Sequence, residues 1–138
     1  MVEINIEYQG QLHCEAMHGP SSCKLSTDAP VDNCGRGESF SPTDLVATAL
    51  GTCVATIMGI YADRHDLNLE GMTVKVEKHM STDLPRRIAR LPVHINVPVA
   101  LEDKHRKSIE NAASHCPVHQ SLRADIEAPL NFVYPEKL

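Results

Sequence analysis

Hydrophobic and polar residues alternate along the first part of the chain. The alternation at residues 2–8, and again at 12–16 after a Gln-Gly pair, predicts two half-buried strands that form a hairpin. A short third strand is expected at residues 23–27. The segment 28–40 is rich in Pro, Asp, Asn, Gly and Ser, which is typical of a loop.

The pattern changes at Ser41, where a helix is expected to begin. Ser41 can cap the helix, Pro42 suits the first turn, and Asp44 stands three residues past the cap, as in a capping box. No charged residue occurs in the 18 residues from Leu45 to Ala62, a length that raises the question of a membrane span. Three Thr and two Gly dilute this run, so we expect a long, central, buried helix that ends near residue 65, and no membrane partner.

The second half again places its strands in runs. Alternation predicts strands at residues 71–80 and 88–99, and an amphipathic helix is expected at 102–115. Pro117 forces a break before a new helical turn at 116–122, and a last strand is expected at 128–134. This order predicts an α+β fold with antiparallel sheets. The length of 138 residues suits a single domain, 1–138.

The predicted long helix has two different faces. Cys53 lies at the centre of a bulky apolar stripe, and the opposite face carries Asp44 and a small-residue column: Ala47, Thr48, Gly51, Ala55, Gly59 and Ala62. Glycine inside a helix is unfavourable by about 0.5–1 kcal/mol relative to Ala, so two glycines here need a reason. Close approach by the same helix of a second copy supplies one, and we expect a homodimer.

Two cysteines draw attention, and each has two interpretations. Cys53, on an apolar stripe, is either an inert core residue or a reactive thiol, and spacing alone favours the inert one. Cys116 lies at a predicted helix cap between His115 and His119. A helix N-terminus and nearby imidazolium favour the thiolate, so Cys116 is either reactive near neutral pH or a surface residue in a tight turn.

Composition excludes several classes of function. The net charge is −5, no basic run occurs and Trp is absent, so no nucleic-acid partner is expected. The five cysteines are an odd number without a CxxC pair, and the start of the chain does not resemble a signal peptide, so we expect free thiols in the cytoplasm. Cys14 and Cys23 are interpreted as structural, and Cys34 as an exposed loop thiol that could also resolve an oxidised cysteine. Cys116 and His119 form half of a zinc-like site without a second half, so no metal or cofactor is expected.

Two motifs together carry a family resemblance. The stretch "FSPTDLVATALGTCVATIM" and the later "HCPVHQSL", about sixty residues apart, resemble the OsmC/Ohr family of osmotically inducible protein C and the organic hydroperoxide resistance proteins. The order of strands and helices fits as well, so the resemblance covers nearly the whole chain. It implies an intertwined α+β homodimer with the cysteine helices of both subunits at its centre.

The resemblance also implies a reaction. Cys53 would be the peroxidatic nucleophile that a hydroperoxide oxidises to a sulfenic acid, and Cys116 would condense with it to a disulfide. A dithiol reductant, such as a lipoyl protein or thioredoxin, would then reopen that disulfide.

The sequence departs from the family where the thiolate is activated. Organic hydroperoxide resistance proteins carry a Glu ten residues before the Cys that orients an Arg from the first hairpin. Here that position is Thr43, and residues 7–13 contain no Arg. The substitute candidates are Arg36, which Glu38 would orient, and His18.

Three functions therefore compete. The leading hypothesis is a thiol-dependent peroxidase for hydroperoxides, most of all organic ones. The alternative is a non-enzymatic dimer that binds a small apolar ligand, or that responds to redox state through Cys53 and Cys116. A general dithiol oxidoreductase is weaker, because the sequence has no CxxC motif.

Overall fold

The computed structural model describes residues 1–136, which form two compact units, one from Met1 to Val46 and the other from Ala47 onward. The boundary falls inside the long helix α1 (Pro42–Arg64).

The first unit is a three-stranded antiparallel sheet in the order β1-β2-β3. Its strands are β1 (Ile4–Tyr8), β2 (His13–His18) and β3 (Lys24–Asp28), and they confirm the predicted hairpin and third strand. A 3-10 turn, η1 (Val31–Asn33), interrupts the predicted loop, and Cys34 follows it with a left-handed φ of 64°.

Strand β2 is half-buried as expected, but β1 is exposed along its whole length, contrary to the expectation for that strand. The register pairs Ile6 with Ala16 and Ala16 with Leu25, which places these three side chains on the face that also carries Ile4 and Tyr8. Ile4, Ile6 and Tyr8 remain 52%, 68% and 63% exposed. The alternation predicted the strands correctly, but within residues 1–46 the apolar side chains of β1 are left exposed.

Helix α1 begins where the sequence predicted, with the capping box in place. The Ser41 N–H donates to Asp44 Oδ2 at 2.9 Å, and the Asp44 N–H donates to Ser41 Oγ at 3.1 Å. These bonds satisfy two backbone donors that a helix start leaves without a partner inside the helix. The helix ends at Arg64, one residue before the predicted end.

The second unit contains two small sheets. One has the order β4-β7-β8 and the other pairs β5 with β6; the strands are β4 (Thr73–Val76), β5 (His79–Met80), β6 (Ile88–Arg90), β7 (Val93–Asn96) and β8 (Leu130–Val133). The strands predicted at 71–80 and 88–99 are therefore each broken in two. Pro92 lies at the second break, and a proline has no N–H to donate to a strand ladder.

The expectation of antiparallel sheets holds for every pair except β7 and β8, which are parallel. Parallel neighbours need a long crossover connection. Here helices α2 (Asp103–Ser114) and α3 (Pro117–Ser121) supply it.

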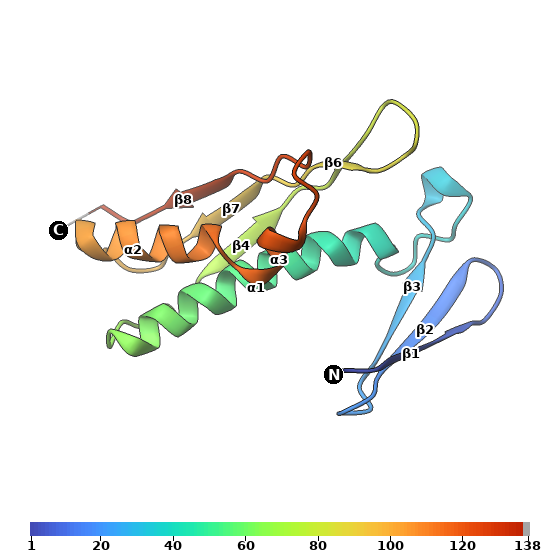
Figure 1. Ribbon diagram of the computed structural model, residues 1–138, viewed down its shortest axis with the longest axis horizontal. Coiled ribbons are helices and arrows are strands. Elements are labelled where there is room, and N and C mark those ends of the chain that lie inside the picture. Colours follow the sequence, from blue (N-terminus) through green and yellow to red (C-terminus); the bar gives the residue numbers. More distant parts are fainter. Residues whose placement is uncertain (137–138) are drawn as a thin grey trace. The chain divides into compact units, whose positions relative to one another are not determined.

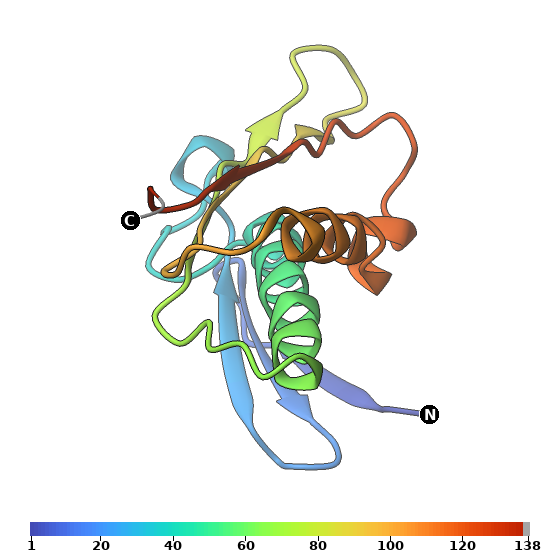
Figure 2. The same cartoon turned by 90° about the vertical axis from the view of Figure 1, so that its left-hand side faces the viewer.

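The core of the second unit lies between its main sheet and its helices. Figures 1 and 2 show α1 and α2 on the same face of the sheet β4-β7-β8. The helices and the sheet contribute the fully buried side chains Leu50, Val54, Met58, Val93, Ile95 and Ile109, and Leu91 joins them from the segment just before β7. At the edge of the core the Tyr134 hydroxyl donates to Glu110 at 2.8 Å, and Arg106 lies 4.2 Å from the ring centre. Burial first, and this hydrogen bond second, raise the pKa of Tyr134.

Part of the small-residue column of α1 packs against the chain's own sheet, which the sequence did not predict. The buried residues of the helix are Ala47, Leu50, Gly51, Val54, Met58 and Ala62, so half of the small-residue column packs inward. A Cβ on Gly51 would lie 2.8 Å from Val76 Cγ2 on β4. The close approach that Gly51 permits is therefore to the chain's own sheet, and not to a second copy.

The stripe around Cys53 is only partly covered, so α1 is not buried on all sides. Cys53 and Ile57 are half-buried, and Ile60 is 42% exposed. By length and composition α1 could also cross a membrane, a criterion that the core helix of a water-soluble domain meets equally well.

Candidate functional site

Cys53 opens into a groove of about 380 Å³ between α1 and α3. Its lining side chains come from two turns of α1 and the start of α3: Ala49, Thr52, Thr56, Ile57, Pro117 and Val118, besides Cys53 itself. None of them is charged. A shallow uncharged groove of this kind suits a small apolar molecule.

The two threonines make the groove less polar than their composition suggests. Thr52 Oγ1 donates to the Thr48 carbonyl at 2.8 Å, and Thr56 Oγ1 donates to the Thr52 carbonyl at 2.7 Å. Both hydroxyl protons are thus used by backbone carbonyls of the same helix.

Cys116 lies beside this groove, at the N-cap of α3. Its side chain is completely buried, and its Sγ accepts a hydrogen bond from the His119 N–H at 3.4 Å. The predicted cap is confirmed, and the alternative of a surface cysteine is wrong. The Cys116 N–H and carbonyl are also used, since the N–H donates to the Ala113 carbonyl and the carbonyl accepts from the Gln120 N–H.

Burial raises the pKa of the Cys116 thiol, and this corrects the expectation of a readily formed thiolate. The His119 N–H acts in the opposite direction, while the neighbouring Cys53 thiol raises the pKa further. The sequence indicated the helix cap and the flanking histidines, which favour the thiolate, but it did not indicate that the Cys116 side chain is buried. Desolvation of the charged form outweighs the cap.

The structure brings Cys53 and Cys116 together from positions far apart in the sequence. All five cysteines are in the thiol form. Cys14 is half-buried, Cys23 is exposed, and Cys34 is exposed in its loop, as the sequence predicted for Cys34. Cys53 and Cys116 both belong to the second unit, and they are near enough for Cys53 to affect the pKa of Cys116.

Arg36 lies in the first unit, next to a carboxylate that sequence reasoning missed. Its guanidinium Nη2 is 3.7 Å from Asp28 Oδ1, and the same oxygen is 2.6 Å from His13 Nδ1. Asp28 is only 2% exposed. The hairpin register pairs His13 directly with Asp28, and this register was the signal that could have found the cluster.

The other two candidates make different contacts. Glu38 is exposed, and it is Asp28 that lies within ion-pair distance of Arg36 among residues 1–136. His18 is half-buried at the end of β2, and its Nδ1 hydrogen-bonds to Ser21 Oγ at 2.6 Å.

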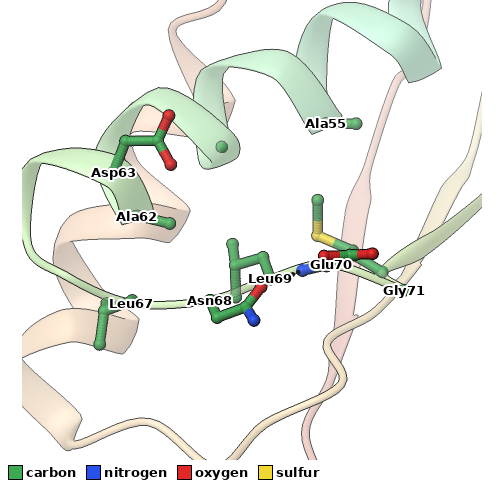
Figure 3. Close-up of a pocket in the computed structure, with 10 residues that line it drawn as sticks. Ala55, Ala62, Asp63, Leu67, Asn68, Leu69, Glu70 and Gly71 are labelled. Atoms are coloured by element: carbon green, nitrogen blue, oxygen red, sulfur yellow. Dashed lines mark hydrogen bonds between the residues drawn. The ribbon is translucent and has the colours of Figure 1, made fainter.

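A second cavity, of about 400 Å³, lies on another side of α1 (Figure 3). Ala55, Ala62 and Asp63 border it from the helix, and the segment 67–72 runs along its other side. A Cβ on Gly59 would meet no atom within 4 Å, so this part of the small-residue column is open. Across residues 1–136 no three His, Cys, Asp or Glu side chains are grouped so that they could hold a metal ion.

The chain is similar to known proteins both in sequence and in structure. The sequence profile of OsmC-like proteins matches residues 35–130. A crystallised protein from Psychrobacter arcticus 273-4, provisionally described as an osmotic stress induced and detoxification response protein, is 41% identical, with a TM-score of 0.91 and 96% of each chain covered. No curated protein matches the sequence.

More distant solved structures share the fold. An organic hydroperoxide resistance protein OsmC from Legionella pneumophila is 16% identical, with a TM-score of 0.76 over 96% of each chain. An organic hydroperoxide resistance protein from Elizabethkingia anophelis, solved with thiocyanate bound, is 15% identical, with a TM-score of 0.78 over 98% of this chain and 96% of that one. The profile match, the 41% identical relative and the paired thiols on one α+β scaffold agree, and the chain belongs to the family of OsmC-like proteins.

Proposed function

We propose that this protein is a thiol-dependent peroxidase that reduces organic hydroperoxides. The observation that carries the proposal is the pair of thiols at the uncharged groove, with Cys53 in its lining and Cys116 buried beside it, close enough for the two thiols to interact. Membership of a family that includes organic hydroperoxide resistance proteins supports the same chemistry.

In the proposed reaction each thiol has a distinct role. The Cys53 thiolate attacks the terminal peroxide oxygen, the O–O bond breaks, and the alkoxide leaves as an alcohol after taking up a proton. Cys53 is then a sulfenic acid. Cys116 attacks its sulfur, an S–S bond forms, and the hydroxyl leaves as water with the thiol proton. An external dithiol, such as a lipoyl protein or thioredoxin, reduces the disulfide, and no metal or bound cofactor is needed.

Activation of Cys53 requires a positive charge that the groove lining lacks. Arg36 is the proposed source, with His18 as the other candidate. The geometry favours Asp28 over Glu38 as the carboxylate that orients Arg36, because the buried Asp28 carboxylate is the one at ion-pair distance. Asp28→Asn is expected to slow oxidation of Cys53 more than Glu38→Gln does, and equal rates in the two variants would exclude this role.

A cytoplasmic homodimer is part of the proposal. The bare apolar face of β1–β3, with Ile4, Ile6 and Tyr8 more than half exposed, is a surface that soluble proteins normally cover. A second copy of the chain would cover it. Sedimentation at micromolar concentration is expected to give a dimer, and a wild-type monomer would exclude that arrangement.

One observation favours the non-enzymatic alternative. Every side chain that lines the groove is uncharged, so the groove could hold a small apolar ligand without activating Cys53. The two thiols would then act only as a slow redox-responsive pair.

Peroxide consumption decides between the two functions. We expect rapid oxidation of wild-type Cys53 by cumene hydroperoxide in stopped-flow experiments, and sustained turnover with dihydrolipoamide or thioredoxin as the reductant. Cys34→Ser is the matched control, because Cys34 is an exposed thiol outside the groove. An oxidation rate no faster than that of free cysteine would favour the binding function.

A further inference from the structure

The short helix that holds Cys116 cannot be stable by itself. Helix α3 has only five residues, and isolated helices shorter than about 12–15 residues are marginal in water. The Ser121 hydroxyl donates to the Pro117 carbonyl, and the Gln120 amide donates to the Ser114 carbonyl. These side-chain bonds stay within residues 114–121 and do not fix the helix to the rest of the unit.

The His119 side chain supplies a connection to the sheet. Its Nε2–H donates to the Ala128 carbonyl at 3.3 Å. The neighbours of Ala128 are held by sheet hydrogen bonds, since the Leu91 N–H donates to the Glu127 carbonyl at 2.7 Å and the Val93 N–H donates to the Pro129 carbonyl at 2.9 Å. The imidazole therefore ties α3 to a backbone segment that the sheet fixes in place.

The same residue also contacts the thiol through its backbone. The His119 N–H donates to Cys116 Sγ at 3.4 Å, so the ring holds the peptide unit that in turn holds the sulfur. We propose that His119 is a positioning residue for Cys116, which keeps the buried thiol directed at Cys53. This inference rests on the proposed function for its role in turnover, whereas its structural content can be tested without peroxide.

Position matters most in the step that closes the disulfide. Cys116 must approach the Cys53 sulfur as the S–O bond of the sulfenic acid breaks, and the geometry of approach governs the rate of such an intramolecular step. Loss of the ring hydrogen bond is expected to loosen α3 and slow this closure by about two- to tenfold, the effect of one typical hydrogen bond. Oxidation of Cys53 itself, which precedes closure, is expected to stay unchanged.

The test compares His119→Ala with His119→Gln, because a glutamine amide can place a donor near the position of Nε2. His115→Ala is the matched control: His115 also flanks Cys116, but its Nδ1 hydrogen-bonds to Ser114 Oγ and the Asn111 carbonyl, both on α2. Closure is measured with the full-length protein and diamide, a thiol oxidant that forms the disulfide without peroxide, and with one equivalent of cumene hydroperoxide while a dimedone probe traps the sulfenic acid.

The outcomes separate this inference from the proposed function. Slower diamide closure in His119→Ala, recovery in His119→Gln and no change in His115→Ala would support the positioning role. Equal rates in His119→Ala and His115→Ala, or no recovery in His119→Gln, would overturn it. Absence of trapped sulfenic acid in Cys116→Ser, which cannot close the disulfide, would count against the peroxidase and leave the diamide result on His119 to be judged by itself.

Discussion

Cys53 and Cys116 belong to one site but differ in burial and in the helix that carries them. Cys53 is half-buried in the middle of a 23-residue helix and lines an open groove. Cys116 is completely buried at the cap of a five-residue helix, where its sulfur accepts a backbone hydrogen bond. The difference shows that the two thiols are suited to different steps. The accessible Cys53 can meet a substrate, and the buried Cys116 is held in a fixed position to react with its neighbour.

Replacement of the accessible thiol is expected to have the largest effect. Cys53→Ser should lower peroxide turnover by about 10³-fold or more, because the variant lacks the nucleophile. Turnover is measured by peroxide loss in the presence of dihydrolipoamide. If Cys116→Ser lost the first oxidation event and Cys53→Ser kept it, the assigned roles would have to be exchanged.

Replacement of the buried thiol is expected to stop the reaction one step later. Cys116→Ser should consume one equivalent of peroxide per subunit at the wild-type rate and then stall as a sulfenic acid, which intact-protein mass spectrometry detects as one added oxygen. Cys34→Ser serves as the control. Continued turnover in Cys116→Ser, lost again when Cys34 is also replaced, would show that Cys34 resolves the sulfenic acid instead.

The buried environment of Cys116 also predicts a pH dependence. Burial raises the pKa of this thiol, so at a given pH it has less thiolate than a free thiol, and its alkylation should rise only at higher pH. The rate is measured on the Cys116 peptide in the Cys53→Ser background, with N-acetylcysteine as the reference. A midpoint at or below that of N-acetylcysteine would mean that the cap outweighs burial.

The smallest expected effects come from substitutions at two glycines of α1, the helix that carries Cys53. They test how closely each side of this helix is packed. Gly51→Ala places a Cβ 2.8 Å from Val76 Cγ2 and should destabilise the fold by about 1–2 kcal/mol, since the strain exceeds the gain in helix propensity. Gly59→Ala meets no atom within 4 Å and should stabilise it by about 0.5–1 kcal/mol. Both values come from urea unfolding; a loss of stability or dimerisation in Gly59→Ala would indicate that a second copy approaches there.

Local patterns in the sequence predicted local structure well. Ser41 and Asp44 predicted the start of α1, and its capping box is formed. The Pro117 signal predicted the break that places Cys116 at a cap. These features depend on residues within a few positions of one another, and steric limits and capping bonds act over that range.

Longer-range features needed the folded chain. The face of α1 that packs on the sheet could not be predicted, because both faces are apolar or small and only the proximity of Gly51 to Val76 shows which one faces β4. The Asp28 carboxylate next to Arg36 and His13 joins residues from two strands and a loop. Helical periodicity contains no information on either contact.

The sequence by itself determined the elements, the two thiols and the family to which the chain belongs, because propensity, capping and motif spacing are properties of neighbouring residues. Only the tertiary structure decided that Cys116 is buried, that its pKa is raised, and that Cys53 is near enough to contribute to that rise. The physical reason is that burial and the influence of one thiol on the other arise from atoms about sixty residues apart in the chain, which come together only when α3 packs beside α1.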